Sequence, residues 1–389
     1  MFSIIRNQKV RNTVLQGLFL LILVFAIAGA VITARTTLNE QGITSGFDFL
    51  ERSTGFNIGF SLVEYSANDS YGRLIWVGIL NTILLGLAGI VLANIVGLII
   101  AILRTSTNAV LNTFGTVYVE IFRNIPMILQ VFFWYALLTH LPAPKQAYNV
   151  LDLFYATSRG FYFPGLNISS VSVAACGAWL AFGLTFIAWF AMARRFSKVP
   201  NGKRRALSRI ALAVVVLVAL ATLIMGRVPN TPLLSIPALK GLNLRDGLLI
   251  PPEFAALAIG MASYGGAYLA EIFRAGFISV RRGQIEAARS LGLKPWHVFS
   301  RVRLPLAIRA ILPTLINQYV WLFKATTLGI VVGFTDFFSV ISVSITQSGQ
   351  TLELIGILMV GFLIMNNSIS LLLNRINKAI KLKGTQLRT

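Results

Sequence analysis

The chain has 389 residues, of which 56% are apolar and only 12% carry a charge, whereas soluble domains carry about 25% charged residues. This composition excludes an ordinary soluble globular protein and indicates a lipid environment. The formal net charge of +21 would suit nucleic-acid binding. However, the basic residues lie in short segments between apolar stretches, a distribution typical of membrane topology and not of a nucleic-acid interface.

Long apolar stretches follow one another along the whole chain. A helix that crosses about 30 Å of hydrocarbon needs roughly 20 apolar residues. Seven stretches contain no Asp, Glu, Lys or Arg, and an eighth is interrupted only by Lys324. The sequence therefore predicts an all-α membrane protein with about eight transmembrane helices, at residues 14–34, 74–103, 124–144, 171–193, 210–226, 254–270, 310–335 and 354–374.

The basic residues also predict the orientation of these spans. If both termini are cytoplasmic, 24 of the 34 basic residues fall in the cytoplasmic segments, as the positive-inside rule expects. The reverse orientation would place the basic loops outside. We therefore expect a multi-pass membrane protein with cytoplasmic N- and C-termini.

The first apolar stretch has two interpretations. Its basic start and the small residues Ala28, Gly29 and Ala30 are similar to a signal peptide with a cleavage site. The apolar run of residues 14–34 is longer than a usual signal core, which favours a first span that is not cleaved.

Cysteine and histidine usage predicts neither disulfides nor a metal site. Cys176 is the only cysteine and lies inside a predicted span, where it is expected to be a small packing residue. His140 and His297 are the only histidines, and they lie in loops on opposite sides of the membrane. We expect no metal and no cofactor.

The inner loop of residues 272–309 has the strongest internal pattern outside the spans. Residues from Glu286 to Leu291 favour a short helix. Gly292 can adopt the left-handed conformation that ends such a helix. The sequence therefore predicts a helix followed by a sharp turn.

A second short helix is predicted directly after this turn. Pro295 suits its first position, and Trp296, Phe299 and Val302 recur every three residues to form one apolar stripe. Pro305 is expected to end it. Aromatic residues exposed outside the lipid, with basic residues around them, indicate a surface that binds another protein.

The spacing of this loop carries a family resemblance. Glu286-Ala287-Ala288, then Gly292, Val302 and Leu304-Pro305 resemble the EAA loop of permease subunits of ATP-binding-cassette (ABC) importers, which usually has Ile in place of Val302. In that family the loop docks into a groove of the cytoplasmic ATPase. The resemblance implies that a cytoplasmic ABC ATPase dimer is contacted here by Glu286, Ala287, Ala288, Gly292, Trp296, Phe299, Leu304 and Pro305.

Two further segments narrow the resemblance. Residues 119–135 and 266–292 resemble the polar amino-acid subgroup of these permeases, and Asn124-Ile125-Pro126 is similar to the general L-amino-acid permeases. The resemblance implies a type I ABC importer core of five helices, with an N-terminal span and an inserted helical hairpin. It also implies an L-amino-acid substrate, a second homologous permease subunit in a heterodimer and a periplasmic amino-acid-binding protein.

The resemblance divides the chain into five segments, all of them parts of one membrane domain. They are an N-terminal span with a periplasmic loop (1–73), the first part of the core (74–139), an inserted periplasmic segment and hairpin (140–250), the rest of the core (251–374) and a basic cytoplasmic tail (375–389).

Ionisable residues within the spans are candidates for function because their insertion costs about 2.5 to 3.5 kcal/mol each. Glu120 with Arg123, and Glu271 with Arg274, lie three residues apart and can form local ion pairs. Glu271 has the alternative role of contacting a substrate ammonium group. Lys324 has two alternative roles, either to hold a helix break as part of a gate or to bind a carboxylate.

A substrate path is predicted near Lys324. Asn317, Gln318 and Thr326 lie in the same span and add hydrogen-bonding groups that a helix surrounded by lipid would not need. Together with Glu271 and Lys324, these residues are expected to line the path.

Other function classes are less consistent with the sequence. Gly202-Lys203 is followed by Arg204 and lacks the upstream glycine of a phosphate-binding loop, so we expect a transport subunit without enzyme activity whose ATPase is a separate chain. The alternative, a secondary transporter or channel working without an ATPase, would predict inverted repeats and carboxylates at the midplane. An intramembrane enzyme would need motifs such as His-Glu-x-x-His. Together with the family resemblance, this implies an importer subunit of a bacterial inner (plasma) membrane that works by alternating access.

Overall fold

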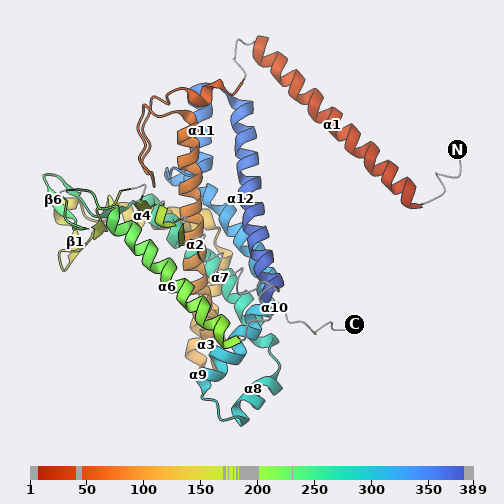
Figure 1. Ribbon diagram of the computed structural model, residues 1–389, viewed down its shortest axis with the longest axis vertical. Coiled ribbons are helices and arrows are strands. Elements are labelled where there is room, and N and C mark those ends of the chain that lie inside the picture. The colour runs from red at the N-terminus through yellow and green to blue at the C-terminus, as the bar shows by residue number, and fades with distance from the viewer. Residues whose placement is uncertain are drawn as a thin grey trace.

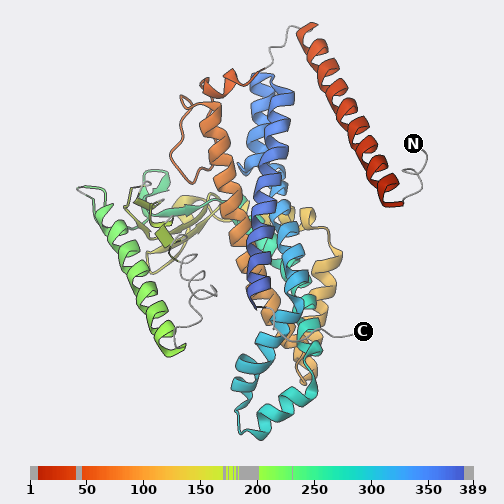
Figure 2. The ribbon, with the colours of Figure 1, turned by 45° about the vertical axis from the view of Figure 1, so that its right-hand side comes forward.

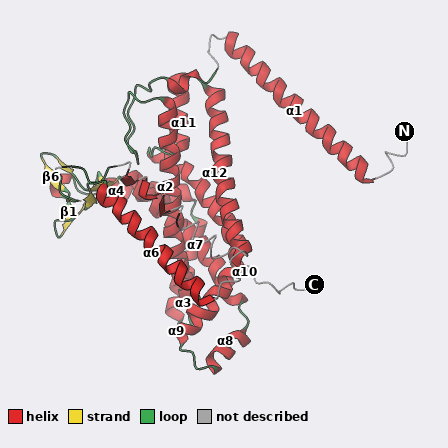
Figure 3. Cartoon of the chain, in the orientation of Figure 1, coloured by secondary structure: helices red, strands yellow, loops and turns green. Residues whose placement is uncertain are grey.

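A bundle of helices forms most of this computed structural model (Figures 1 and 3). The structure describes residues 8–40, 46–169, 172–173, 175–177, 179–180, 183, 201–229 and 231–380. Its long helices are α1 (Gln8–Glu40), α2 (Tyr71–Arg104), α3 (Ala109–Asn124), α4 (Met127–Thr139), α6 (Asn201–Met225), α7 (Pro252–Ser279), α10 (Leu304–Lys324), α11 (Phe337–Ser348) and α12 (Thr351–Ile380).

The apolar helices agree with the predicted spans. Within the described residues, six helices are long and apolar enough to cross a membrane, and there are seven if the bent pair α3–α4 counts as one span. These helices correspond to seven of the eight predicted spans and confirm the all-α membrane fold. The other predicted span, residues 171–193, lies almost wholly outside the described residues.

Helix α7 lies at the centre of the bundle. Of its apolar segment 72% is buried, against 11% for α12 and none for α1, and α1 stands apart from the bundle in Figures 1 and 2. Helices α2, α3, α4 and α10 pack around α7. The buried side chains between them include Leu85, Leu257, Met261 and Leu322, all fully buried. The helices that carry the function are therefore assembled on α7.

Small residues allow α2 and α7 to approach closely. A Cβ atom on Gly97 of α2 would lie 2.7 Å from the Cβ of Leu269 and 3.0 Å from the carbonyl oxygen of Gly266, both on α7. A Cβ atom on Gly266 would lie 2.7 Å from a methyl group of Val96. Because real Cβ atoms do not approach other atoms so closely, only glycines allow this crossing, as in other membrane helix pairs.

The predicted span at residues 124–144 is wrong in its form. The structure divides this region into α3 and α4, which are bent by 102° at the break between them. Ile125 adopts an extended conformation, as a residue before Pro126 prefers. The side-chain amide of Gln130 donates hydrogen bonds of 2.9 Å to the carbonyls of Phe122 and Ile125, which satisfies the end of α3.

A strap of residues 52–70 lies over one end of the bundle, next to the short helix η1 (Asp48–Glu51). Asn81 of α2 is fully buried beneath it. Its amide group donates to the carbonyls of Phe60 (3.0 Å) and Thr335 (2.8 Å) and accepts a bond from the amide of Leu62 (3.1 Å). One polar side chain thus joins the strap, α2 and the loop before α11.

Short strands and a 3-10 turn, η2 (Pro144–Gln146), occupy residues 144–166 and 234–250 beside the bundle (Figure 2). One antiparallel sheet has the order β1-β2-β3-β8, and β4 pairs with β5 and β6 with β7. The strands are β1 (Tyr148–Val150), β2 (Phe154–Thr157), β3 (Gly160–Phe163), β4 (Gly165–Leu166), β5 (Leu234–Ser235), β6 (Ala238–Lys240), β7 (Asn243–Arg245) and β8 (Leu248–Ile250).

These strands were not predicted from the sequence. Each has only two to four residues, too few for an alternating pattern to be recognised. The pairing is also distant in the sequence, since Phe161 lies opposite Ile250. The local signal was Gly241, whose φ of +69° suits the first position of the two-residue turn between β6 and β7.

We predict that Gly97→Leu destabilises the bundle by about 1 to 3 kcal/mol, because a side chain there overpacks the α2–α7 contact. Thermal unfolding of the purified protein in detergent measures the effect. The matched control is Gly29→Leu on α1, where an added Cβ meets nothing within 4 Å. Equal unfolding temperatures for the two variants would contradict the assigned role of Gly97.

Candidate functional site

The predicted inner loop forms two short helices at the end of the bundle opposite the strap (Figure 1). Helix α8 (Arg282–Ser290) ends at Gly292, which has a φ of +74°. The amide of Gly292 donates to the carbonyl of Arg289 (2.9 Å), and the amide of Leu293 donates to that of Ala288 (3.3 Å). This is the Schellman arrangement that commonly ends a helix with glycine. The predicted left-handed turn is confirmed.

The second helix begins as predicted and continues further than predicted. Helix α9 (Pro295–Val298) starts at Pro295, and a π-helical turn, η4 (Phe299–Arg303), joins it to α10. The prediction that Pro305 ends this helix is wrong, because Pro305 lies in the first turn of α10. Proline is tolerated there, and the wider π turn before it changes the hydrogen-bond register.

The predicted contact residues differ in their exposure. Glu286 and Ala287 are exposed on α8 and Ala288 is buried. Trp296 is 70% exposed, and Leu291, which the sequence did not single out, is 81% exposed. These residues form an accessible surface that combines a carboxylate with large apolar side chains.

The remaining predicted residues support this surface from within. The ring of Phe299 lies 5.9 Å from that of Trp296 and 5.6 Å from that of Phe277 on α7. Leu304 and Pro305 are partly buried where α10 begins. The loop therefore rests on both α7 and α10.

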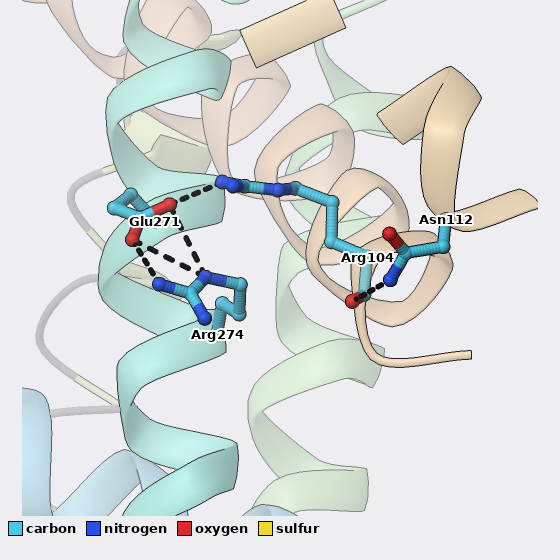
Figure 4. A network of polar contacts seen from close by, with 4 residues as sticks. All are labelled: Arg104, Asn112, Glu271 and Arg274. Atoms are coloured by element: carbon cyan, nitrogen blue, oxygen red, sulfur yellow. Dashed lines mark hydrogen bonds and ion pairs between the residues drawn. The ribbon is translucent and has the colours of Figure 1, made fainter. Parts of the chain in front are cut away.

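Above the loop, charged residues connect three helices (Figure 4). The predicted pair of Glu271 and Arg274 is confirmed, with 3.2 Å between Nε of Arg274 and a carboxylate oxygen. Arg104, at the end of α2, forms a second ion pair with Glu271. The side chain of Asn112 on α3 donates to the carbonyl of Arg104 (2.6 Å). The sequence did not predict that Arg104 binds Glu271, because the two residues are far apart in the chain.

The other predicted pair, Glu120 with Arg123, does not form. Glu120 accepts a hydrogen bond of 3.3 Å from the amide group of Asn124. The guanidinium carbon of Arg123 lies 5.0 Å from the centre of the Tyr268 ring on α7, which is a cation–π contact. Arg123 is therefore positioned by its contact with Tyr268 of α7 and not by an ion pair with Glu120.

The residues predicted to line a substrate path are not gathered in one place. Asn317 and Lys324 are exposed and Gln318 is partly exposed on α10. Thr326 is fully buried, and its hydroxyl donates to the carbonyl of Phe323 (2.8 Å). Glu271 has arginines at both carboxylate oxygens. The path remains a prediction for all five residues.

Lys324 marks a change of helix type. The α-helix α10 ends at Lys324, and the 3-10 helix η5 (Ala325–Val332) follows without a gap. Such transitions often lie at hinges, which agrees with the helix-break role considered for this lysine. Among the described residues, no group of three or more His, Cys, Asp or Glu residues could hold a metal ion.

Comparison with known proteins gives matches over nearly the whole chain. Residues 205–382 match the family described as "Binding-protein-dependent transport system inner membrane component". The chain is 38% identical to the amino-acid ABC transporter permease protein YhdX of Escherichia coli, over 95% of this chain and 94% of that protein.

Two further relatives are similar over nearly their full lengths. The general L-amino acid transport system permease protein AapQ of Rhizobium johnstonii is 35% identical, over 98% of this chain and 94% of that protein. The glutamate/glutamine/aspartate/asparagine transport system permease protein BztB of Rhodobacter capsulatus is 31% identical, over 98% and 96%. Since these alignments cover at least 98% of this chain, they include most of the inserted segment.

We predict that Glu271→Gln lowers the free energy of unfolding by about 1 to 3 kcal/mol, because Arg104, whose side chain is 12% exposed, loses its charged partner. Arg104→Met combined with Glu271→Met should cost less than the sum of the two single changes. Chemical unfolding of the unmodified protein, Arg104→Met, Glu271→Met and the double variant measures this coupling, and the same assay applied to Glu271→Gln measures the first effect.

The matched control is the exposed pair of Lys240 and Asp246, whose side chains are 57% and 43% exposed. Asp246→Asn should cost less than about 1 kcal/mol. Strictly additive effects of Arg104→Met and Glu271→Met would show that this partly buried network does not couple α2 to α7.

Proposed function

This chain belongs to the amino-acid permeases of ABC transporters, and we propose that it translocates L-amino acids by alternating access, driven by ATPase subunits that dock on its α8–α9 loop. As a permease it is a multi-pass membrane transport subunit and not itself an enzyme. The observation that carries the proposal is the accessible surface of Glu286, Ala287, Leu291 and Trp296. The amino-acid substrate is suggested by the names of its relatives.

The loop has the geometry of a mechanical coupling element. From Pro295 to Val332 the chain is helical without interruption, through α9, η4, α10 and η5. A displacement of the loop is therefore carried along one element to Lys324, where the helix changes type. Because Glu286 and Trp296 lie at one end of this assembly, an ATPase that moves the loop would tilt α10 against α7.

The proposed partners follow from polar residues that the single chain leaves exposed within a span. Asn317 and Lys324 are exposed within a span, where lipid is an unfavourable neighbour. We place a second, related permease subunit against this face, so that a path forms between the two. A periplasmic binding protein delivers the amino acid at the opposite end from the loop, and two ATPase subunits bind at the loop.

The orientation in the membrane is tested with reporter fusions. We predict that reporters inserted between Ser290 and Pro295 read cytoplasmic, because the loop must meet the ATPases. Reporters near Asp48 and Arg159 should read periplasmic. Alkaline phosphatase and green fluorescent protein fusions give complementary signals. A cytoplasmic reading near Arg159 would contradict the proposed topology between α4 and α7.

We predict that Gly292→Asp leaves the permease in the membrane but reduces ATP-driven transport to background. The left-handed conformation of Gly292 makes any side chain unfavourable by about 1 to 3 kcal/mol. An added Cβ atom would meet nothing within 4 Å beyond the adjacent residues. The loss therefore arises from a distorted docking surface and not from a steric clash. Transport and substrate-stimulated ATP hydrolysis, measured in proteoliposomes, should fall together.

Gly283 provides the matched control within the same loop. An added Cβ there also meets nothing within 4 Å, but Gly283 does not have a positive φ. Gly283→Asp should therefore transport nearly as well as the unmodified protein, while Glu286→Lys should resemble Gly292→Asp. Ligand affinity of the isolated binding protein stays unchanged in every case. Normal transport by Gly292→Asp at normal expression would refute the coupling role.

A further inference from the structure

Arg123 occupies an unusual position for a charged residue. It lies near the end of α3, just before the 102° bend, and its guanidinium carbon is 5.0 Å from the Tyr268 ring centre. Tyr268 is 16 residues from the start of α7 and 11 from its end. At 1.5 Å per residue these separations are about 24 Å and 17 Å. Arg123 therefore lies beside the middle part of α7, the central helix of the bundle, and not beside either of its ends.

The positive charge of Arg123 has no carboxylate partner in the described part of the chain. The nearest acidic residue along α3, Glu120, accepts from Asn124. The acidic residue one turn beyond Tyr268 is Glu271, which is paired with Arg104 and Arg274. Arg123 is nevertheless exposed. A cation beside the middle of a membrane helix without a counter-charge is costly, so a site that binds an anion offers a physical reason for it.

Aromatic rings surround the position of the guanidinium group on the α7 and α10 side. The rings of Tyr264 and Tyr268 are 4.9 Å apart, and Tyr264 stacks on Trp321 of α10 at 5.3 Å and 27°. The hydroxyl of Tyr264 donates to that of Tyr268 at 3.4 Å. These rings form a wall that can hold an apolar side chain while leaving the guanidinium group accessible.

The face of α10 that carries Trp321 also carries polar residues. Asn317 and Lys324 lie four residues before and three residues after Trp321, so they share its side of the helix. Both are exposed. This face of α10 thus adds one cation and one amide next to the aromatic wall, and Arg123 of α3 is the second cation.

We infer that Arg123, seated on Tyr268 and flanked by Tyr264 and Trp321, binds the carboxylate of an amino acid during its passage. A guanidinium group presents a planar fork that matches a carboxylate, and its contact with the ring keeps that fork in place. This inference rests on the proposed transport function and specifies which part of the substrate the permease recognises. A lipid phosphate has similar chemistry, but lipid headgroups lie at the membrane surface and not beside the middle of a membrane helix.

The experiment measures amino-acid binding to the assembled complex without ATP and without the binding protein. The complex, in nanodiscs of phosphatidylcholine, is titrated with radiolabelled L-leucine, L-glutamine and L-glutamate, and with 3-methylbutylamine, which is L-leucine without its carboxylate. We expect Arg123→Gln to weaken binding of all three amino acids by about tenfold or more, the loss expected for a charge-assisted hydrogen bond. The unmodified complex should discriminate against the amine, and Arg123→Gln should lose most of this discrimination.

Two conservative variants separate recognition from a structural role. Arg123→Lys keeps the charge and should recover part of the affinity. If Arg123→Gln does not assemble, Tyr268→Leu, which removes the ring beneath the guanidinium group, is measured instead and should weaken amino-acid binding several-fold. Arg245→Gln, an exposed arginine of β7, is the matched control and should bind like the unmodified complex.

Several results would overturn the inference. These are unchanged amino-acid affinity in Arg123→Gln or in Tyr268→Leu, an equal loss for L-leucine and its amine, or binding that disappears when phosphatidylglycerol replaces part of the phosphatidylcholine, which would show that an anionic lipid headgroup occupies the site. Because the assay requires neither ATP nor transport, its failure is distinct from failure of the coupling role of Gly292. A complex that loses amino-acid affinity in Arg123→Gln but shows no ATP hydrolysis coupled to the α8–α9 loop would support the carboxylate site and contradict the coupling role.

Discussion

The close approach of α2 and α7 is the contact on which the rest of the structure depends. Gly97 and Gly266 let the two backbones meet, and within a membrane such packing replaces the hydrophobic effect as the force that holds helices together. The ion pair between Arg104 and Glu271 lies further along the same pair of helices. Both the loop beyond α7 and the bent α3–α4 pair are positioned by this contact.

Two buried polar side chains, Asn81 and Gln130, join distant segments of the bundle. Asn81 binds backbone groups of the strap and of the loop before α11, and Gln130 satisfies the carbonyls that the α3–α4 bend leaves open. Each supplies hydrogen bonds that the buried backbone groups would otherwise lack. Arg123 differs from these residues because its contact is with a ring, which leaves its hydrogen-bond donors available.

The loop and the bundle are connected by two helices with different properties. Helix α7 is largely buried and provides a fixed support, whereas the helical run through α9, η4 and α10 contains a π turn and a change to 3-10 geometry at Lys324. Both departures from α geometry lie at the ends of α10. A continuous helix between two adjustable points suits an element that transmits displacement, and the proposed carboxylate site lies beside the end of α10 at Trp321.

The sequence by itself determined six of the spans, the turn at Gly292 and the start of the second loop helix at Pro295, because apolar length, glycine conformation and proline geometry are local properties. It also identified the Glu271–Arg274 pair, since three residues on a helix define one face. The tertiary structure alone decided that Arg104 joins this pair, that Arg123 contacts Tyr268 in place of Glu120, and that Phe161 pairs with Ile250. These contacts join residues far apart in the chain, and only the packing of α2, α3 and α7, together with the pairing of short strands, brings such residues within reach.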